Sequence, residues 1–349
     1  MDNYIKQPRW KKVEYSRNQI IKAGKTIKKE CTPAEEEKAL RIIDNWRAAH
    51  AFPLQVIYMH LKKMASSNNN IIVAQRLKRL DSIVNKLKRE PSMSLWAIQD
   101  LGGCRFIVSS IDDVYNYSDK YRNSRIRHIF TKEYDYIKNP KTSGYRSLHV
   151  VYEYHSDKND DYNKNMLIEI QFRTHLQHLW ATAVETMGLF SKEALKAGKG
   201  SEDTKRFFAL VSSLFAIQEN MPTVPNTPSD IDEITHEIET LNAKNNYLDF
   251  LTSIRVITKM EEDNDAKANN EYCVLSLNYQ THHLTIKRFK SSEIEQANEY
   301  YIGLESLKVD NQTDTVLVRV SSFNALKKAY PNYFSDISEF VAIIKSYLS

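Results

Sequence analysis

Two acidic residues beside apolar, strand-like runs are the first candidates for chemistry. Asp100 precedes the run GGCRFIV, and Arg105 lies inside that run. In EIQFRT, Glu169, Gln171 and Arg173 alternate with apolar residues, so on a strand they would share one face. Charged side chains on one face of an apolar strand are costly to bury unless they line a cavity. The alternation therefore predicts that these three side chains face a polar cavity.

A cation-rich glycine turn lies between these two runs, in DYIKNPKTSGYRSLH (135–149). Lys141, Tyr145 and His149 surround Gly144 in this segment. Cations can hold phosphate groups through charge-assisted hydrogen bonds, and an aromatic ring can stack on a base. The segment therefore predicts a binding site for a nucleotide.

Residues 71–89 are predicted to form a helix with one apolar stripe. At about 100° per residue the stripe falls within about 80°; its members are Val73, Leu77, Leu80, Val84 and Leu87. Arg76, Arg79 and Lys86 form a neighbouring arc that could lean into a cleft, whereas Lys78 and Arg89 should point away. An ordinary amphipathic helix with snorkelling cations would show the same pattern.

Four stretches together resemble the synthetase domain of the RelA/SpoT family in order and spacing. They are RLKRLDSIVNK, DLGGCR, DYIKNPKTSGYRSLH and EIQFRTHLQHLW, within about residues 40–190. The resemblance implies an α+β fold of the nucleotidyltransferase type, with a mixed β-sheet flanked by helices and a smaller C-terminal α/β domain. It also implies an enzyme that moves pyrophosphate from ATP to the 3′-hydroxyl of a nucleotide or RNA end.

The same resemblance implies roles for individual residues. Asp100 and Glu169 would be catalytic and would hold Mg²⁺, and Glu169 would also activate the attacking hydroxyl. The expected ATP-binding cations are Arg76, Arg79, Lys86 and Arg105. The expected acceptor-binding residues are Lys141, Tyr145, His149 and Gln171, with the Tyr145 ring stacked on the acceptor base. Two carboxylates with phosphate oxygens suit Mg²⁺, and cations suit the charge of phosphoryl transfer.

The chain departs from the family pattern at one position of the glycine-turn motif. Tyr134 stands directly before DYI, where alarmone synthetases usually have Lys, and Lys132 lies two residues upstream. A phosphate contact is therefore lost or supplied differently. The residues before the synthetase motifs also lack the His-Asp region of the longer family members, so we expect synthesis without hydrolysis of the product.

Length and composition predict about two domains. The chain has 349 residues, 42% of them hydrophobic, and a net charge of +5. Residues 1–30 hold nine Lys/Arg and three Asp/Glu and predict a basic N-terminal arm over 1–31, of the kind that contacts phosphate-rich partners or only improves solubility. The proline-rich segment MPTVPNTPSD then divides a synthetase domain (32–221) from a C-terminal regulatory domain (222–349).

The cysteine content and the terminal sequence indicate a cytoplasmic protein. Cys31, Cys104 and Cys273 have no CxxC spacing, which excludes a disulfide framework or a four-cysteine zinc site. No apolar stretch is long enough for a membrane helix, and the N-terminus lacks the apolar run of a signal peptide.

Local patterns place the elements around these motifs. Thr32-Pro33-Ala34-Glu35 predicts a capped helix to about His50, and Pro53 opens a second one. GCRFIVSS, RHIFTKEYDYI, RSLHVVYEY and NMLIEIQFRT predict strands, with a helix in IDDVYNYSDKY. Residues 175–221 should be helical. Two helices to Met260, a hairpin (YCVLSLNY and HHLTIKRF), a helix, the strand TVLVRV and terminal helices should follow.

Two acceptors remain open, and the C-terminal region bears on the choice. A free GDP or GTP needs a closed base pocket, whereas a tRNA 3′ end needs a basic track, for which Lys28 and Lys29 are candidates.

Tyr330-Pro-Asn-Tyr333 resembles the YxxY motif of the CapRel group of fused toxin–antitoxin proteins. That resemblance implies a pseudo-zinc-finger-like tail that blocks the ATP site, release by a phage capsid protein, and tRNA modification in anti-phage defence. Two tyrosines packed around a proline turn, or an inactive interaction protein, are the alternatives.

Overall fold

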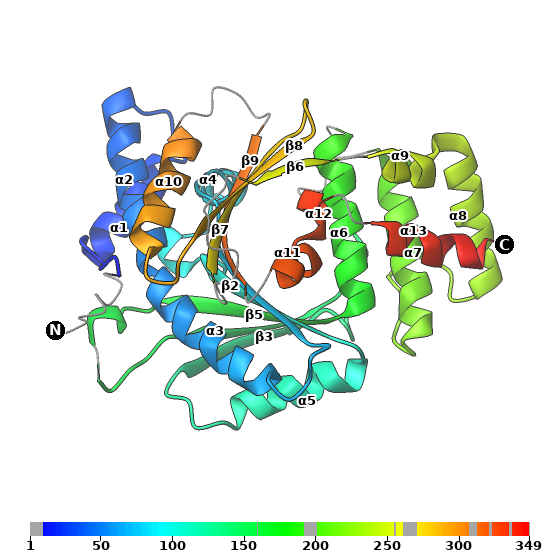
Figure 1. Cartoon of the computed structure of the whole chain (residues 1–349), viewed down its shortest axis with the longest axis horizontal. Helices are drawn as coiled ribbons and strands as arrows, with labels where there is room; N and C mark the ends of the chain where they lie inside the picture. The colour runs from blue at the N-terminus through cyan, green and yellow to red at the C-terminus, as the bar shows by residue number, and fades with distance from the viewer. Residues whose placement is uncertain are drawn as a thin grey trace.

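The computed structural model has an α+β architecture built around one large sheet (Figure 1). It describes residues 10–158, 160–191, 201–254, 256–260, 271–306, 313–320, 323–334 and 337–348. No helix in these ranges has the length and apolar character needed to span a bilayer. The predicted fold class, a mixed sheet flanked by helices, is confirmed.

The elements before the proline-rich segment contain all the family motifs. The helices are α1 (Arg17–Thr26), α2 (Pro33–Ala49), α3 (Ala51–Ala65), α4 (Leu80–Arg89), α5 (Ile111–Arg122), α6 (His175–Phe190) and α7 (Glu202–Gln218), with 3-10 turns at Leu95–Ala97 and Asp160–Tyr162. The strands are β1 (Ile72–Leu77), β2 (Gly102–Val108), β3 (Ile129–Asp135), β4 (Leu148–Glu153) and β5 (Leu167–Thr174).

The elements after that segment are a second set of helices and strands. The helices are α8 (Ile231–Asn245), α9 (Tyr247–Ser253), α10 (Ile294–Ser306), α11 (Phe323–Ala329), α12 (Pro331–Phe334) and α13 (Ser338–Tyr347). The strands are β6 (Ile257–Met260), β7 (Glu271–Asn278), β8 (His283–Phe289) and β9 (Thr313–Val320).

All the described strands join one sheet in the order β3-β4-β5-β2-β1-β9-β7-β8-β6. The pairs β2–β5 and β6–β8 are parallel, and the others are antiparallel. The two halves of the chain meet where Gln75 and Arg76 of β1 pair with Arg319 and Val318 of β9. The domain boundary predicted at residue 221 falls in an irregular segment between α7 and α8, but the chain on its two sides shares this sheet.

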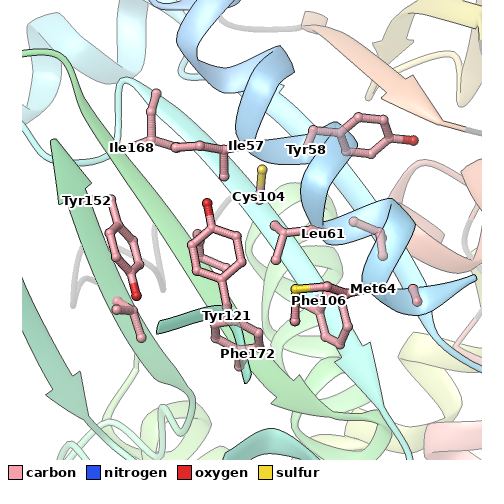
Figure 2. Packing of buried hydrophobic residues seen from close by; sticks show 14 of the residues in the cluster. Ile57, Tyr58, Leu61, Met64, Cys104, Phe106, Tyr121, Tyr152, Ile168 and Phe172 are labelled. Atoms are coloured by element: carbon pink, nitrogen blue, oxygen red, sulfur yellow. The ribbon is translucent and has the colours of Figure 1, made fainter. Parts of the chain in front are cut away.

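One face of the sheet is closed by an apolar core under α3 and α5 (Figure 2). Ile57 and Leu61 of α3 and Tyr121 of α5 are fully buried against Phe106 and Phe172 of the sheet. Because side chains alternate along a strand, this packing sends the residues next to Phe106 and Phe172 to the opposite face. That opposite face carries the polar residues of the family motifs.

Most of the predicted elements are present. Thr32 caps α2, and Thr32 and Glu35 form the predicted capping box. All four strands predicted between residues 103 and 174 are found, and β7 and β8 form the antiparallel hairpin. The predicted helix over residues 71–89 is wrong in its first half, because residues 72–77 pair with β2 along their whole length. The β-branched run before Ala74 favours that pairing, so only α4 remains helical.

Two further expectations need correction. The N-terminal region is not an extended arm from residue 10 onward, because α1 buries Ile20 and Ala23 against α2; residues 1–9 lie outside the described part of the chain. Residues 257–260 form β6 rather than the end of a helix.

A buried ion pair fixes the glycine-turn segment to α7. The Arg146 guanidinium lies 2.8 Å from the Glu219 carboxylate, and both side chains are almost fully buried. Gln177 of α6 also donates a hydrogen bond of 3.2 Å to Glu219. A single carboxylate therefore holds the turn segment and the start of α6 together.

Glu219→Ala should lower the free energy of unfolding by about 3–5 kcal/mol, because it leaves the Arg146 charge buried without a partner. The matched control is Glu237→Ala, which removes the half-exposed partner of Arg206 and should cost under about 1 kcal/mol. Urea unfolding of both variants measures the difference. Equal losses would show that the buried pair does not hold this region.

Candidate active site

The strand register places the polar residues of the motifs in rows across the face of the sheet that lies opposite to α3 and α5. In one row, Tyr134 of β3 is opposite His149 of β4, which is opposite Gln171 of β5, which pairs with Arg105 of β2. In the next row, Glu169 pairs with Gly103, which is opposite Arg76 of β1. The prediction that Glu169, Gln171 and Arg173 share a face is confirmed.

A cavity of about 820 Å³ opens over this face. Its lining includes six of the predicted site residues, namely Arg76, Arg105, Lys141, Tyr145, His149 and Gln171, together with Arg173. Four strands and the glycine-turn segment therefore bring together residues that are almost 100 positions apart in the chain. The predicted site residues Asp100, Glu169, Arg79 and Lys86 are not part of this lining.

A continuous network of hydrogen bonds joins Tyr145 to polar side chains of β4 and β5, on the side of the site where acceptor binding was predicted. The Tyr145 hydroxyl lies 2.7 Å from Nε2 of His149, and Nδ1 of His149 lies 2.9 Å from Oε1 of Glu169. Gln171 donates to Oε2 of Glu169 at 2.6 Å. Arg173 donates to the Tyr145 hydroxyl at 3.1 Å and to the Gln171 carbonyl oxygen at 2.5 Å. Both Glu169 oxygens are thus oriented by neighbouring side chains.

This hydrogen-bond network shifts the pKa values of the titratable groups within it. Burial by itself lowers the pKa of His149, but Tyr145 and Glu169 raise it to about 9, so the imidazolium carries both donors. Burial by itself raises the pKa of Tyr145, but the charges of His149 and Arg173 lower it to about 8. Burial likewise acts against the Glu169 charge, yet the His149 cation keeps the pKa of Glu169 below its ordinary value. Glu169 is therefore an ionised carboxylate.

Asp100 precedes β2 and lies between two ammonium groups. Its carboxylate oxygens are 2.5 Å from Nζ of Lys78 and 3.1 Å from Nζ of Lys86. Burial opposes the charge of Asp100, but these two lysines lower its pKa to about 2. The expectation that Lys78 points away is wrong, because Lys78 follows a strand rather than lying inside a helix, and its amide bonds to Leu101.

The two carboxylates fit the requirements of a magnesium ion. Asp100 and Glu169 are both ionised and lie close enough for the Asp100 charge to act on the Glu169 pKa. In the described ranges, no three acidic, histidine or cysteine side chains gather into a closed metal cage. Mg²⁺ prefers one or two carboxylates together with phosphate oxygens, so this pair leaves room for a phosphate ligand.

The C-terminal segment covers the opposite, Arg105 side of the site. The Tyr330 ring lies 5.2 Å from the Arg105 guanidinium, and Arg105 donates a hydrogen bond of 3.0 Å to the Ala329 carbonyl. The Tyr330 hydroxyl donates to the Gln75 carbonyl at 3.1 Å. In Figure 1, α11 and α12 lie between the sheet and α6. The Tyr330 ring therefore contacts the guanidinium of Arg105, one of the predicted ATP-binding cations.

A second predicted ATP-binding cation is also held by this half of the chain. Arg79, which precedes α4, forms an ion pair with the buried Asp314 of β9. Tyr333 donates a hydrogen bond of 2.7 Å to the same carboxylate and is itself buried. Arg79 is thus directed towards β9 and α12 rather than into the cavity.

The predicted tRNA-binding lysines lie after α1. Lys28 donates to the carbonyl oxygens of Pro91 and Met93, at 2.8 Å for Pro91, so it ties α1 to the segment before Asp100. Lys29 is exposed. Neither residue lines the cavity.

Comparison with known proteins agrees with these motifs. Residues 75–193 match the family described as "Region found in RelA / SpoT proteins". This part of the chain is therefore similar to the RelA/SpoT region. The matched segment contains β2, β4, β5, α6 and the glycine turn, and residues within it supply most of the cavity lining. The family match thus coincides with the site.

Individual relatives cover parts of the chain. GTP pyrophosphokinase YwaC of Bacillus subtilis is 37% identical over 114 residues, which are 31% of this chain and 52% of that protein. GTP pyrophosphokinase YjbM of the same organism is 33% identical over 112 residues. The chain spans about half the length of these curated relatives. A solved structure of small alarmone synthetase 2 from Bacillus subtilis has a TM-score of 0.44 and 24% identity, covering 51% of this chain and 94% of that one.

Sequence reasoning missed two residues of the site. Lys78 holds Asp100, and its position two residues after Arg76 would have indicated a shared strand face. His178 of α6 lies 2.8 Å from the Lys328 carbonyl and lines the cavity. No local pattern indicates His178, because its partner is 150 residues away.

The raised pKa of His149 predicts a pH-dependent stability. Its folded pKa of about 9 exceeds the ordinary value of 6.5, so its stabilising effect is complete below pH 6.5 and declines as the pH rises. The difference in unfolding free energy between wild type and His149→Gln should therefore shrink by roughly 1–2 kcal/mol between about pH 6.5 and 8. Urea unfolding at several pH values measures it. A constant difference would show that His149 is neutral in the folded protein.

Proposed function

We propose that this chain is an ATP-dependent pyrophosphokinase that transfers pyrophosphate to the 3′-hydroxyl of tRNA. The observation that carries the proposal is the pair of ionised carboxylates, Asp100 and Glu169, with the cation Arg76 in the row of Glu169. The match of residues 75–193 and the names of the two pyrophosphokinase relatives support the reaction class. A cation that can bind an anion, Arg76, and a candidate base, Glu169, therefore lie on one face of the sheet.

In the proposed reaction the 3′-oxygen of the acceptor attacks the β-phosphorus of ATP. The bond between that phosphorus and the oxygen bridging to the α-phosphate breaks, and AMP leaves with this oxygen. Glu169 accepts the proton of the attacking hydroxyl, and His149 and Gln171 orient the carboxylate for it. Arg76 and Arg105 neutralise phosphate charge, which is most of what phosphoryl transfer needs. Bound Mg²⁺, held by Asp100 and Glu169, would supply further neutralisation of that charge.

The Arg105 guanidinium supports ATP binding on this side. Burial and the charges of Arg76 and Arg173 lower the pKa of Arg105, so the cluster of cations is unfavourable without an anion. Its buried Nε atom has no hydrogen-bond partner in the described part of the chain. Phosphate oxygens would satisfy both the charge and this donor. Lys86 would join them after exchanging its contact with Asp100.

The acceptor side suits a base stacked on Tyr145. The ring is half-buried at the cavity wall, with Lys141 within 5.5 Å of its centroid, and Lys141 and His149 could contact acceptor phosphates. The exposed Lys29 is a candidate contact for the body of a tRNA, whereas Lys28 already donates to two carbonyls. The alternative acceptor is GDP or GTP, which the names of the two pyrophosphokinase relatives favour.

We also propose that the C-terminal segment inhibits the enzyme in cis, in the cytoplasm, until a phage protein such as a capsid subunit releases it. Tyr330 and Ala329 contact the Arg105 guanidinium, and Asp314 pairs with Arg79. Two predicted ATP-binding cations therefore have partners from the C-terminal half of the chain. ATP and the segment would then compete for the same groups. The inhibited state need be favoured by only a few kcal/mol, because an effector must supply that difference.

Glu169→Gln should abolish transfer, because it removes the base while keeping the side-chain volume; it also removes the charge that pairs with His149, so some stability is lost. The measurement is incorporation of label from γ-labelled ATP into bulk tRNA, GDP or GTP, with and without Mg²⁺. Label in tRNA supports the proposed acceptor, and label only in GDP or GTP supports the alternative. Full activity of Glu169→Gln would contradict the role of this carboxylate.

Tyr330→Ala should raise the transfer rate at least about tenfold, because it removes the ring from Arg105 and frees the ATP site. The control is Tyr347→Ala, which removes a tyrosine of the same region that bonds only peripherally, to Gln218 of α7. Transfer rates and ATP affinity are measured for both. A Tyr330→Ala protein that is folded but no more active than the control would reject cis-inhibition through this residue.

A further inference from the structure

A ladder of alternating cations and tyrosine rings leads away from the acceptor side of the site. Lys132 lies 4.8 Å from the ring centroid of Tyr134, and the Tyr134 and Tyr136 rings are nearly parallel with centroids 5.9 Å apart. Lys141 lies 4.3 Å from the Tyr136 ring. Tyr136 in turn meets the edge of Tyr145 at 6.0 Å. The ladder therefore continues directly from the ring proposed to stack on the acceptor base.

The alternation of β3 sorts its side chains by charge. Lys132 and Tyr134 are opposite Val151 and His149, on the face that carries the site. Glu133 instead pairs with Arg122, and Asp135 accepts a hydrogen bond from Tyr115; both partners belong to α5 on the other face. The two acids of the sequence KEYDY are thus turned away from the ladder, which leaves it cationic and aromatic.

We propose that Tyr134 and Tyr136, with Lys132 and Lys141, bind the nucleotide that precedes the acceptor nucleotide in an unpaired RNA 3′ end. This proposal rests on the transfer to an RNA end proposed above. Aromatic rings beside a basic track are the usual means of holding successive unpaired bases. Lys132 and Lys141 are exposed, so each ammonium can leave its ring for a phosphate when a base stacks there.

A mononucleotide acceptor would make no use of most of this ladder. Its base would stack on Tyr145, and its phosphates would reach Lys141 and His149, whereas Tyr134 lies beyond Tyr136. The Tyr134 hydroxyl bonds to Gln99 at 3.1 Å, which orients the ring, but that bond does not account for Lys132. A longer acceptor explains both the second ring and the second lysine.

The test is equilibrium binding to the full-length protein, measured by anisotropy of 5′-fluorescein-labelled CpCpA. The unlabelled competitors are pA, pCpA, pCpCpA and GDP. Binding at the acceptor side does not require release of Tyr330, since Tyr330 contacts Arg105 and not Tyr145. We expect pCpA to compete roughly ten- to a hundredfold better than pA, as one added stacked base would allow.

Tyr134→Ala should remove most of the gain from pA to pCpA and leave pA itself unchanged, whereas Tyr134→Phe should keep the gain. The matched control is Tyr300→Ala, because Tyr300 of α10 also has a lysine, Lys287, 4.1 Å from its ring. Equal competition by pA and pCpA in the wild type, or a Tyr134→Ala protein that keeps the gain, overturns the proposal.

Label transfer from ATP, measured on the same preparations and on Tyr330→Ala, separates this proposal from the proposed function. Transfer to GDP with no effect of acceptor length would reject the subsite and leave the pyrophosphokinase assignment standing. Length-dependent binding without transfer to any acceptor would reject the enzyme function and keep the RNA-binding ladder.

Discussion

Positive charge is concentrated on one face of the sheet, and the neighbouring elements must offset the repulsion among these cations. Arg76, Arg105 and Arg173 approach one another closely enough for Arg76 and Arg173 to lower the pKa of Arg105. Like charges at such positions are unfavourable without nearby anions or π-faces. The Ala329 carbonyl and the Tyr330 ring contact Arg105, and the Tyr145 hydroxyl and the Gln171 side-chain oxygen accept hydrogen bonds from Arg173.

The charged side chains on the two sides of the site have partners from different parts of the chain. On the side formed by β4 and β5, His149, Glu169, Gln171 and Arg173 bond one another, so this half is organised by residues within the segment that matches the RelA/SpoT family. On the Arg105 side, the partners are Ala329 and Tyr330, from far along the chain. Preorganised donors and acceptors suit a site that must bind without rearrangement. Partners from another segment suit a site that can be exposed or covered.

The shared sheet explains how the C-terminal segment reaches the site. Pairing of β9 with β1 brings Asp314 beside Arg79, and α11 and α12 then follow directly onto the uncovered face. Burial of Tyr330 and Tyr333 beside Leu275, Val316 and Val318 adds apolar contact to the polar ones. Polar and apolar contacts therefore hold this segment against the sheet together, and any displacement of the segment would break both.

Local patterns determined much of the fold and the chemistry. The alternation in EIQFRT predicted the shared face of its polar residues, and GYR predicted the turn at Gly144, because strand alternation and turn chemistry depend on adjacent residues. The same reasoning failed for residues 71–89, where pairing with β2 overrides a helical spacing of apolar residues. His178 and the Asp314–Arg79 pair could not be found from the sequence. Their partners are brought close only by the folded sheet, so the tertiary structure alone decided which charges meet and which cations line the cavity.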